Sequence, residues 1–309
     1  MSNSKISMFG VSASGKTCLL YAMSQVVGRG IRQNDNLVQI ISNRASQQMK
    51  LNDGFMQLAQ HRWPQTSDRT ESYDFRVGIQ YNGHYSDVIE SLEIQDYRGG
   101  LLQTTSHLDQ EEFDDLMHSF RGSSAIIFIV DGQTIIDALD DSDKHVSHRG
   151  NTDILRQFQA QSQIRFVENI FLEYKRVSHD VPPIMIAISK GDIFASEEEK
   201  LNAKRFVKQA LPSIFAMGSG LTTAITVLSL GEKLGTDADG NLTGRLSLDT
   251  DFNIHVPLLF GIYSDLCYQY EETADEAERR GISAVLNFLR SLFADRVDLY
   301  INGRPAHAV

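Results

Sequence analysis

Short runs of apolar residues recur along the chain, and most are followed by a stretch in which apolar positions repeat at helical spacing. A continuous apolar run is typical of a parallel strand that is buried on both faces. Four such runs predict buried strands: residues 5–9, 125–131, 184–188 and 224–228. The sequence predicts helices from residue 18 onward and over residues 43–60, 151–177, 197–211, 257–270 and 275–295, and a loop followed by a helix over residues 101–121.

A different pattern appears between the first two of these runs. Residues 73–79 alternate between apolar and polar side chains, as a half-exposed strand does. Asn82-Gly83 is a strong hairpin-turn signal, and residues 87–95 return as the paired strand. Two antiparallel strands therefore deliver the chain to Asp96. Shorter strands are expected at residues 37–41 and 297–302.

This order of elements predicts an α/β fold: a doubly wound, mostly parallel sheet with one antiparallel strand and surface insertions. We expect one domain over residues 1–272 and a C-terminal helix with a short strand-like extension over residues 273–309. The domain carries insertions near residues 28–62, 137–150 and 232–252. The second is polar and acidic, and its His145 and His148 lack the grouping of a metal site. Asp239-Gly240-Asn241 predicts a hairpin turn within the third.

Composition narrows the classes of function. The hydrophobic fraction of 41% and the charged fraction of 22% are ordinary for a globular protein with a filled core. The net charge of −11 argues against wrapping nucleic acid or lying on anionic lipid, since both need a basic surface. The apolar runs are too short for a membrane span. Two cysteines and the lack of a signal-peptide pattern predict a cytoplasmic location.

The stretch Gly10-Val11-Ser12-Ala13-Ser14-Gly15-Lys16-Thr17 matches G-x-x-x-x-G-K-[ST], the phosphate-binding P-loop. It lies between a predicted strand and a predicted helix, so backbone N–H groups and the positive end of the helix dipole point at one spot. Lys16 is expected to neutralise phosphate charge, and the Thr17 hydroxyl to ligate Mg²⁺. Cys18 opens the helix behind the loop. The alternative is a chance glycine turn before a core helix.

Two further short motifs follow predicted strands. Asp96-Tyr97-Arg98-Gly99 is D-x-x-G, in which the acid holds Mg²⁺ and the glycine N–H contacts the γ-phosphate; Asp and Gly are also plain turn formers. Ser189-Lys190-Gly191-Asp192 is close to [NT]-K-x-D, in which the carboxylate accepts hydrogen bonds from guanine N1–H and the 2-amino group. Adenine offers neither in that pattern, so a site built around the carboxylate rejects it.

With these three motifs in this order, the chain resembles a Ras-like P-loop GTPase of the translation-factor-related class over roughly residues 5–270. Trp63-Pro64, a downstream threonine and the segment Asn253–Leu258 are similar to those of predicted prokaryotic double-GTPase proteins, which are associated with multi-gene conflict or signalling systems. The resemblance implies GTP or GDP and Mg²⁺ as ligands, and effector or regulatory protein subunits as partners.

The resemblance also assigns roles to residues. Catalytic roles fall to Lys16, Thr66 and Gly99, and metal binding to Thr17, Thr66 and Asp96. Nucleotide binding falls to Gly10, Ser12, Ala13, Ser14, Gly15, Lys16, Thr17, Cys18, Lys190, Asp192, Ser229 and Leu230. In GTPases a turn at the place of Ser229-Leu230 donates a backbone N–H to guanine O6.

Two departures bear on catalysis. Gly100 stands where many family members carry the glutamine that orients the attacking water, which implies slow turnover or help from a partner or from Arg98 or Gln103. The switch threonine is either Thr66, which fits the resemblance and is preferred, or Thr70, which lies directly before the second strand.

Three functions remain open from the sequence. The first is a GTP-binding switch with slow or partner-stimulated hydrolysis in a multi-protein prokaryotic system. The second is a catalytically weak, nucleotide-holding structural subunit of a larger assembly. The third is a P-loop phosphotransferase or ATPase in which Asp96 would be the Walker-B acid; Ser189–Asp192 argues against it. The partner, the pathway and the oligomeric state are not encoded in any recognisable pattern.

Overall fold

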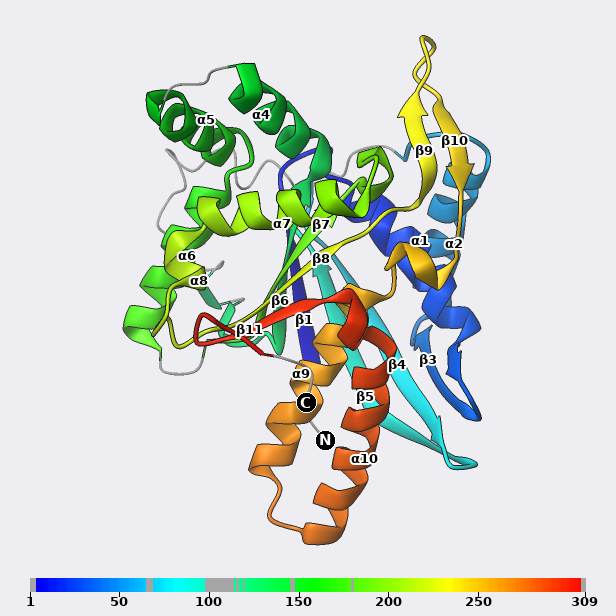
Figure 1. Cartoon of the computed structure of the whole chain (residues 1–309). Helices are drawn as coiled ribbons and strands as arrows, with labels where there is room; N and C mark the ends of the chain where they lie inside the picture. Colours follow the sequence, from blue (N-terminus) through cyan, green and yellow to red (C-terminus); the bar gives the residue numbers. More distant parts are fainter. Residues whose placement is uncertain are drawn as a thin grey trace.

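A computed structural model of the chain describes residues 4–64, 69–97, 114, 117–118, 120–144, 148–178 and 181–306. Its centre is a ten-stranded sheet with the strand order β12-β11-β8-β7-β6-β1-β5-β4-β3-β2 (Figure 1). The parallel strands at its centre are β5 (His84–Asp96), β1 (Ser4–Phe9), β6 (Ala125–Asp131), β7 (Ile184–Ser189) and β8 (Thr222–Val227). The predicted α/β class is therefore confirmed.

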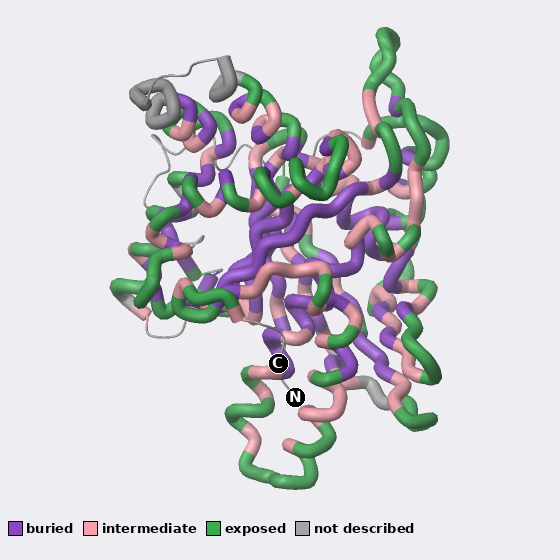
Figure 2. Tube along the Cα trace, viewed as in Figure 1, coloured by how far each residue is buried: buried purple, intermediate pink, exposed green. Residues whose placement is uncertain are grey.

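Central strands bury both faces because successive side chains point to opposite sides of the sheet. In β6, Ile127 and Ile129 belong to one apolar cluster, and Phe128 and Val130 belong to the other. The first cluster is covered by helices α1 (Lys16–Arg29), α2 (Ala45–Ala59), α9 (Val256–Glu272) and α10 (Glu276–Phe293). The second is covered by α4 (Gly132–Lys144), α5 (His148–Gln161), α6 (Ile164–Val177), α7 (Glu197–Ala210) and α8 (Pro212–Phe215). Figure 2 shows the buried strands between these layers.

Antiparallel strands extend the sheet on both sides, which is more antiparallel pairing than the sequence predicts. On one side β5 pairs with β4 (Glu71–Tyr81), which continues into β3 (Asn36–Ser42) and β2 (Ile31–Gln33). On the other side β8 pairs with β11 (Asp298–Ile301), followed by β12 (Arg304–Pro305). The strand-like tail predicted at residues 297–302 thus joins the main sheet. The division at residue 272 stays a prediction.

Two helix predictions were wrong in their detail. The single helix predicted over residues 151–177 is two helices, α5 and α6, which are separated at Ser162-Gln163, where Gln163 has a positive φ of 54°. Residues 137–144 of the predicted surface insertion are helical, because α4 turns Ile135 and Ala138 into the second cluster. Residues 101–113 of the loop and helix predicted over residues 101–121 lie outside the described residues.

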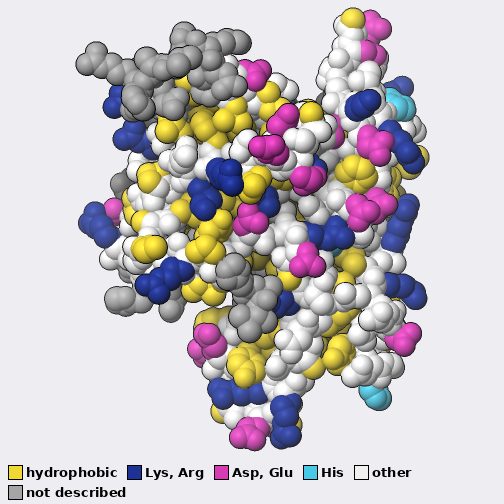
Figure 3. All heavy atoms as spheres, viewed as in Figure 1, with side chains coloured by type: hydrophobic (Ala, Val, Ile, Leu, Met, Phe, Trp, Pro, Cys, Tyr) yellow, Lys and Arg dark blue, Asp and Glu magenta, His cyan; other side chains and the backbone are white. Residues whose placement is uncertain are grey.

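The hairpin predicted in residues 232–252 is present as β9 (Gly231–Thr236) and β10 (Leu242–Leu246), a separate two-stranded sheet. The short 3₁₀ turns are η2 (Gly191–Ile193), η3 (Thr250–Phe252) and η4 (Ala294–Arg296). Lys, Arg, Asp and Glu side chains are interspersed over the face drawn in Figure 3. None of the helices in the described ranges combines the length and apolar character that crossing a bilayer requires.

Candidate functional site

The carboxyl ends of the parallel strands meet at one edge of the sheet, where α/β proteins bind ligands. Strand register places the ends side by side: Met8 of β1 lies opposite Asp96 of β5, and Asp131 of β6 lies opposite Ser189 of β7. The three motifs singled out from the sequence leave the sheet from β1, β5 and β7 at this edge. The fold therefore gathers segments that are far apart along the chain.

The loop after β1 is held in a conformation that suits glycine. Gly10 and Gly15 have φ angles of +155° and +89°. A Cβ at Gly10 would lie 2.6 Å from the Ile129 carbonyl oxygen, so the close approach of this loop to β6 requires glycine there. Ala13 also has a positive φ, of 63°. Ser12 and Ala13 are exposed, whereas the Ser14 hydroxyl is buried and has no hydrogen-bond partner among the described residues.

Lys16, the first residue of α1, is 6% exposed. Its ammonium group donates to the Gly10 carbonyl at 2.7 Å and to the Val11 carbonyl at 3.0 Å, both of them neutral acceptors. Desolvation by burial lowers the pKa of Lys16, and the nearby Asp96 carboxylate opposes that shift. A buried cation with neutral partners is costly, and a bound anion would offset that cost.

Thr17 and Asp96 meet at the junction of α1 and β5. The Thr17 hydroxyl donates to Asp96 Oδ2 at 2.8 Å across 79 residues of sequence. Asp96 Oδ1 is buried and has no partner among the described residues. Desolvation raises the pKa of Asp96, the Thr17 hydrogen bond and Lys16 counteract it, and Glu71 adds to it.

This pair fits Mg²⁺, which is commonly held by one or two side-chain oxygens together with substrate phosphates. A bound cation would coordinate Asp96 Oδ1 and offset the free-energy cost of burying the carboxylate. No group of three or more His, Cys, Asp or Glu side chains gathers anywhere in the described ranges.

The turn after β7 lies against the phosphate loop. Ser189 Oγ donates to the Ser14 carbonyl at 2.8 Å and lies 3.2 Å from the Val130 carbonyl. The hydroxyl at this position thus ties the third motif directly to the first. Ser189 retains the hydroxyl of the threonine that [NT]-K-x-D allows at this position, and this hydroxyl makes the contact.

Asp192, in η2, has a carboxylate that is held by two donors from the chain itself. The Ser229 hydroxyl lies 2.7 Å from Oδ1, and the Leu234 backbone N–H donates to Oδ2 at 2.6 Å. The Ser229 backbone N–H donates to the Phe252 carbonyl at 3.0 Å, so it does not face a ligand. The Leu230 N–H donates to no residue that the structure describes, which makes Leu230 the better candidate for the expected backbone donor.

Lys190 has a left-handed backbone, with φ 55°, and its ammonium forms an ion pair with Asp131 Oδ2 at 2.6 Å. The other oxygen of Asp131 accepts from the Gln133 N–H at 2.9 Å and so caps the start of α4. Asp131 is 16% exposed at its side chain and the Lys190 side chain is 42% exposed. The lysine stem is therefore anchored beside the turn that carries Asp192.

Several predicted site residues fall outside the described residues: Thr66, Arg98, Gly99, Gly100 and Gln103. Thr70 is described and exposed, directly before Glu71, whose place in β4 lies opposite Asp96 of β5. The choice between Thr66 and Thr70 stays open.

Desolvation raises the pKa of the Cys18 thiol to about 12, so this thiol is neutral at physiological pH.

The sequence missed two residues that shape this edge, Asp131 and Leu234, and it assigned Ser229 for its backbone N–H rather than for its hydroxyl. Asp131 follows a buried strand directly, as Asp96 and Ser189 do, and that placement is the signal that was available. No residue pattern marks Leu234, because its role depends on a backbone N–H.

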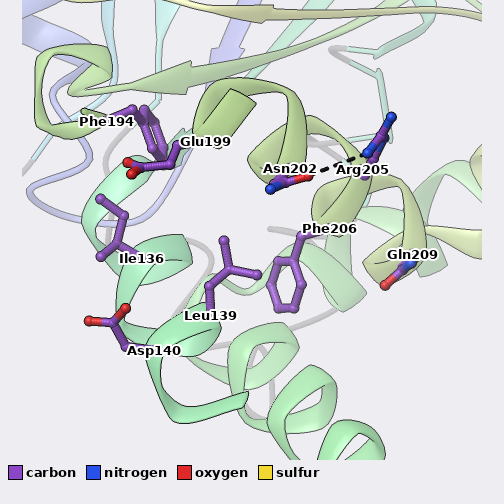
Figure 4. A pocket seen from close by; sticks show the side chains of 9 residues that line it. All are labelled: Ile136, Leu139, Asp140, Phe194, Glu199, Asn202, Arg205, Phe206 and Gln209. Atoms are coloured by element: carbon purple, nitrogen blue, oxygen red, sulfur yellow. Dashed lines mark hydrogen bonds between the residues drawn. The ribbon is translucent and has the colours of Figure 1, made fainter. Parts of the chain in front are cut away.

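A hollow of about 480 Å³ lies beside this edge, between α4 and α7 (Figure 4). Ile136, Leu139 and Phe206 give it apolar walls, and Phe194, two residues after Asp192, closes one end. The remaining lining residues are Asp140, Glu199, Asn202, Arg205 and Gln209. None of the predicted phosphate-binding residues lines this hollow, so it is separate from the candidate nucleotide site.

No family model matches this chain, and a search of curated proteins likewise finds no match. Among solved structures, the chain is similar to the signal recognition particle receptor SRb-GTP/SRX complex from Chaetomium thermophilum, with 16% sequence identity and a TM-score of 0.37. That match covers 77% of this chain and 94% of the other. At this TM-score the likeness carries no argument about binding or activity. What the site can bind therefore follows from its own residues.

Proposed function

We propose that this chain is a GTP-binding protein that hydrolyses GTP slowly or with the help of a partner and acts as a molecular switch. The observation that carries the proposal is the hydrogen bond from Ser189 Oγ to the Ser14 carbonyl, 2.8 Å long. It joins the turn bearing Asp192 to the phosphate loop, so one nucleotide can reach both.

The phosphate end supports a triphosphate with a divalent cation. Among the described residues, the buried Lys16 ammonium has only neutral hydrogen-bond acceptors, so a bound anion would offset the cost of its burial. The loop amides and the N-terminus of α1 add positive potential at the same place. Thr17 and Asp96 would hold Mg²⁺, which supplies charge neutralisation on the phosphate oxygens.

The base end supports guanine over adenine. A carboxylate accepts two hydrogen bonds from guanine N1–H and the 2-amino group, and adenine leaves it unpaired, which costs binding free energy. Asp192 supplies the carboxylate, Lys190 covers the base plane, and Leu230 is the candidate donor to O6. An ATPase role, with Asp96 as Walker-B acid, would leave Asp192 without a ligand.

The wider role rests on the resemblance carried by Trp63-Pro64 and Asn253–Leu258. It supports a multi-protein prokaryotic system in which effector or regulatory subunits are the partners, and the two cysteines favour a cytoplasmic location. Gly100, in place of a water-orienting glutamine, favours slow turnover. The same residue is what favours the second candidate, a structural subunit that holds nucleotide without hydrolysing it.

One experiment separates these functions. One sample of the purified protein is denatured, and the released nucleotide is identified by chromatography. A second, native sample is loaded with GTP and Mg²⁺, and its GTP hydrolysis is followed over time. We expect guanine nucleotide and slow release of phosphate. Guanine nucleotide that stays intact for hours, with or without partner proteins, would favour the structural subunit. Adenine nucleotide with turnover would contradict the proposal.

A further inference from the structure

The hairpin of β9 and β10 contains an irregularity next to the base end of the site. Gly235 pairs with Thr243, but Glu232 pairs with Arg245, so the register shifts between Thr243 and Arg245. Lys233 and Leu234 together face Gly244. Lys233 has a positive φ of 50°, and Gly244 has a positive φ of 86°. This is a β-bulge, a feature that re-aims backbone groups and occurs often beside active sites.

The bulge frees one backbone N–H from the ladder and turns it toward Asp192. The Leu234 N–H donates to Asp192 Oδ2 at 2.6 Å, and the Ser229 hydroxyl holds Oδ1 at 2.7 Å. Hydrogen bonds to a carboxylate are short and strong because the acceptor is charged. One donor on each oxygen fixes the plane of the carboxylate and leaves further lone pairs for a ligand.

The hairpin is also fixed at a second place, by the segment that directly follows α2. The Leu242 N–H donates to the His61 carbonyl at 2.9 Å, and His61 Nδ1 lies 3.0 Å from the Leu242 carbonyl. Leu242 is 3% exposed, and Trp63 Nε1 donates to Thr236 Oγ1 at 3.1 Å. Figure 1 shows the hairpin standing beside α2. The Leu234 N–H therefore belongs to a hairpin that is held in place by hydrogen bonds at both ends.

We propose that this bulge determines base specificity: the Leu234 N–H positions the Asp192 carboxylate so that both oxygens face the guanine edge. The inference rests on the proposed function, since it assigns a positioning group to the same base site. A carboxylate that reads two donors at once must be held in one plane, and specificity falls when it can rotate. Leu234 is a positioning residue and touches no ligand itself.

The test compares two glycine substitutions in the same hairpin. In Gly244→Ala the new Cβ would lie 2.3 Å from the Lys233 carbonyl oxygen, so the bulge must change. Gly240→Ala is the matched control, because Gly240 also has a positive φ, of +85°, but a Cβ there meets nothing within 4 Å. Affinities for GDP, IDP and ADP are measured with Mg²⁺; IDP lacks only the 2-amino group.

We expect Gly244→Ala to lower the preference for GDP over ADP, and for GDP over IDP, by about tenfold, the value of one hydrogen bond to a charged group. Gly240→Ala should keep both preferences. Trp63 is the single tryptophan of the chain, so its emission reports whether the hairpin stays docked on α2. Where Gly244→Ala undocks the hairpin or fails to fold, the α-hydroxy analogue of leucine at position 234 decides instead, because an ester there removes the backbone N–H and keeps the side chain.

The outcomes are distinct. A wild-type protein that does not prefer GDP to ADP refutes both the proposed function and the bulge's role. A wild-type protein that prefers GDP, with variants that keep the full preference, refutes only the bulge's role. In that case Asp192 binds Leu234 merely to anchor the hairpin.

Discussion

The two ends of the candidate site are built in opposite ways. At the phosphate end, polar groups lack matched partners among the described residues: Lys16 has only neutral acceptors there, and Asp96 Oδ1 and Ser14 Oγ have no hydrogen-bond partner. At the base end, both oxygens of Asp192 already accept hydrogen bonds from the chain, and Lys190 is paired with Asp131.

The difference teaches how the two ends divide the work of binding. Groups that gain charge compensation only when a ligand arrives contribute affinity, and they do so for any nucleotide that carries phosphates and Mg²⁺. Groups that are positioned in advance contribute selectivity, because a ligand that does not match them leaves them unpaired. We therefore expect the phosphate end to decide whether a nucleotide binds, and the base end to decide which one.

The largest effect is expected from Lys16→Ala. It removes the charge that would meet the phosphates, and loss of one member of a buried charge pair, here an ammonium facing a bound phosphate, costs about 2–5 kcal/mol. Affinity for GDP and for ADP should both fall, by about a hundredfold or more for GDP, as measured by titration of a fluorescent nucleotide. Lys200→Ala, which breaks an ion pair with Glu197 on the surface of α7, is the control and should change neither. A loss of affinity for only one of the two nucleotides would contradict the division of roles between the phosphate end and the base end.

Asp192→Asn should instead change the choice of base. The amide offers a donor where xanthine has its 2-oxo group, so we expect GDP to bind about thirtyfold more weakly and XDP to gain. Ser229 can turn its hydroxyl to accept from the amide, which limits the damage to the fold. Asp239→Asn at the tip of the hairpin is the control. Unchanged base preference in the Asp192 variant would refute the assignment of this carboxylate.

Lowering the pH should reduce the free energy of unfolding through His255, which lies near the base end. His255 is 1% exposed, and desolvation, with Arg296 next, lowers its pKa to about 4. The unfolded chain takes up a proton near pH 6.5 that the folded chain refuses until about pH 4, so stability falls as the pH drops through this window. From pH 8 to pH 5.5 the loss is about 1.4 kcal/mol from this group.

Urea unfolding at several pH values measures that loss. The segment leading to His255 holds the base end, since Asn253 Nδ2 donates to the Val227 carbonyl at 2.9 Å. His255→Asn should flatten this part of the pH dependence, and His84→Asn, at an exposed position, should not. A slope that persists in the His255 variant would show that another group is responsible.

The smallest effect is expected where the two ends touch. Ser189→Ala removes the hydrogen bond to the Ser14 carbonyl and leaves that carbonyl buried, at a cost of about 1 kcal/mol in the free energy of unfolding. Affinity for GDP should fall about fivefold. Ser189→Thr keeps the hydroxyl and should restore both values. Equal behaviour of the Ala and Thr variants would mean that the bond does not join the ends.

The phosphate end was more predictable from the sequence than the base end. Eight consecutive residues encode the loop, and their backbone conformation is local, so Gly10 and Gly15 could be interpreted directly. The base end depends on contacts between distant segments, such as Leu234 with Asp192, that follow from a bulge and have no fixed spacing. The motif places Ser189 at the end of a strand, but the acceptor of its hydroxyl, the Ser14 carbonyl, lies in another loop and has no fixed spacing from it.

The same distinction explains the fold. The buried strands were predicted because a short, continuous apolar run such as residues 184–188, bounded by Pro182-Pro183, is typical of a central parallel strand. The break between α5 and α6 was missed because apolar spacing continues across Ser162-Gln163, where Gln163 takes a positive φ. Helix α4 was missed over residues 137–144 because its acidic face obscured the apolar positions Ile135 and Ala138.

Competition between GDP and ADP for the protein loaded with fluorescent GDP and Mg²⁺ tests the central claim most directly. If amides and Lys16 hold the phosphates while Asp192 selects the base, GDP should displace the label at concentrations about a hundredfold lower than ADP. Displacement by the two nucleotides at equal concentrations would contradict it, and would leave a phosphate-binding loop without a base-selecting partner.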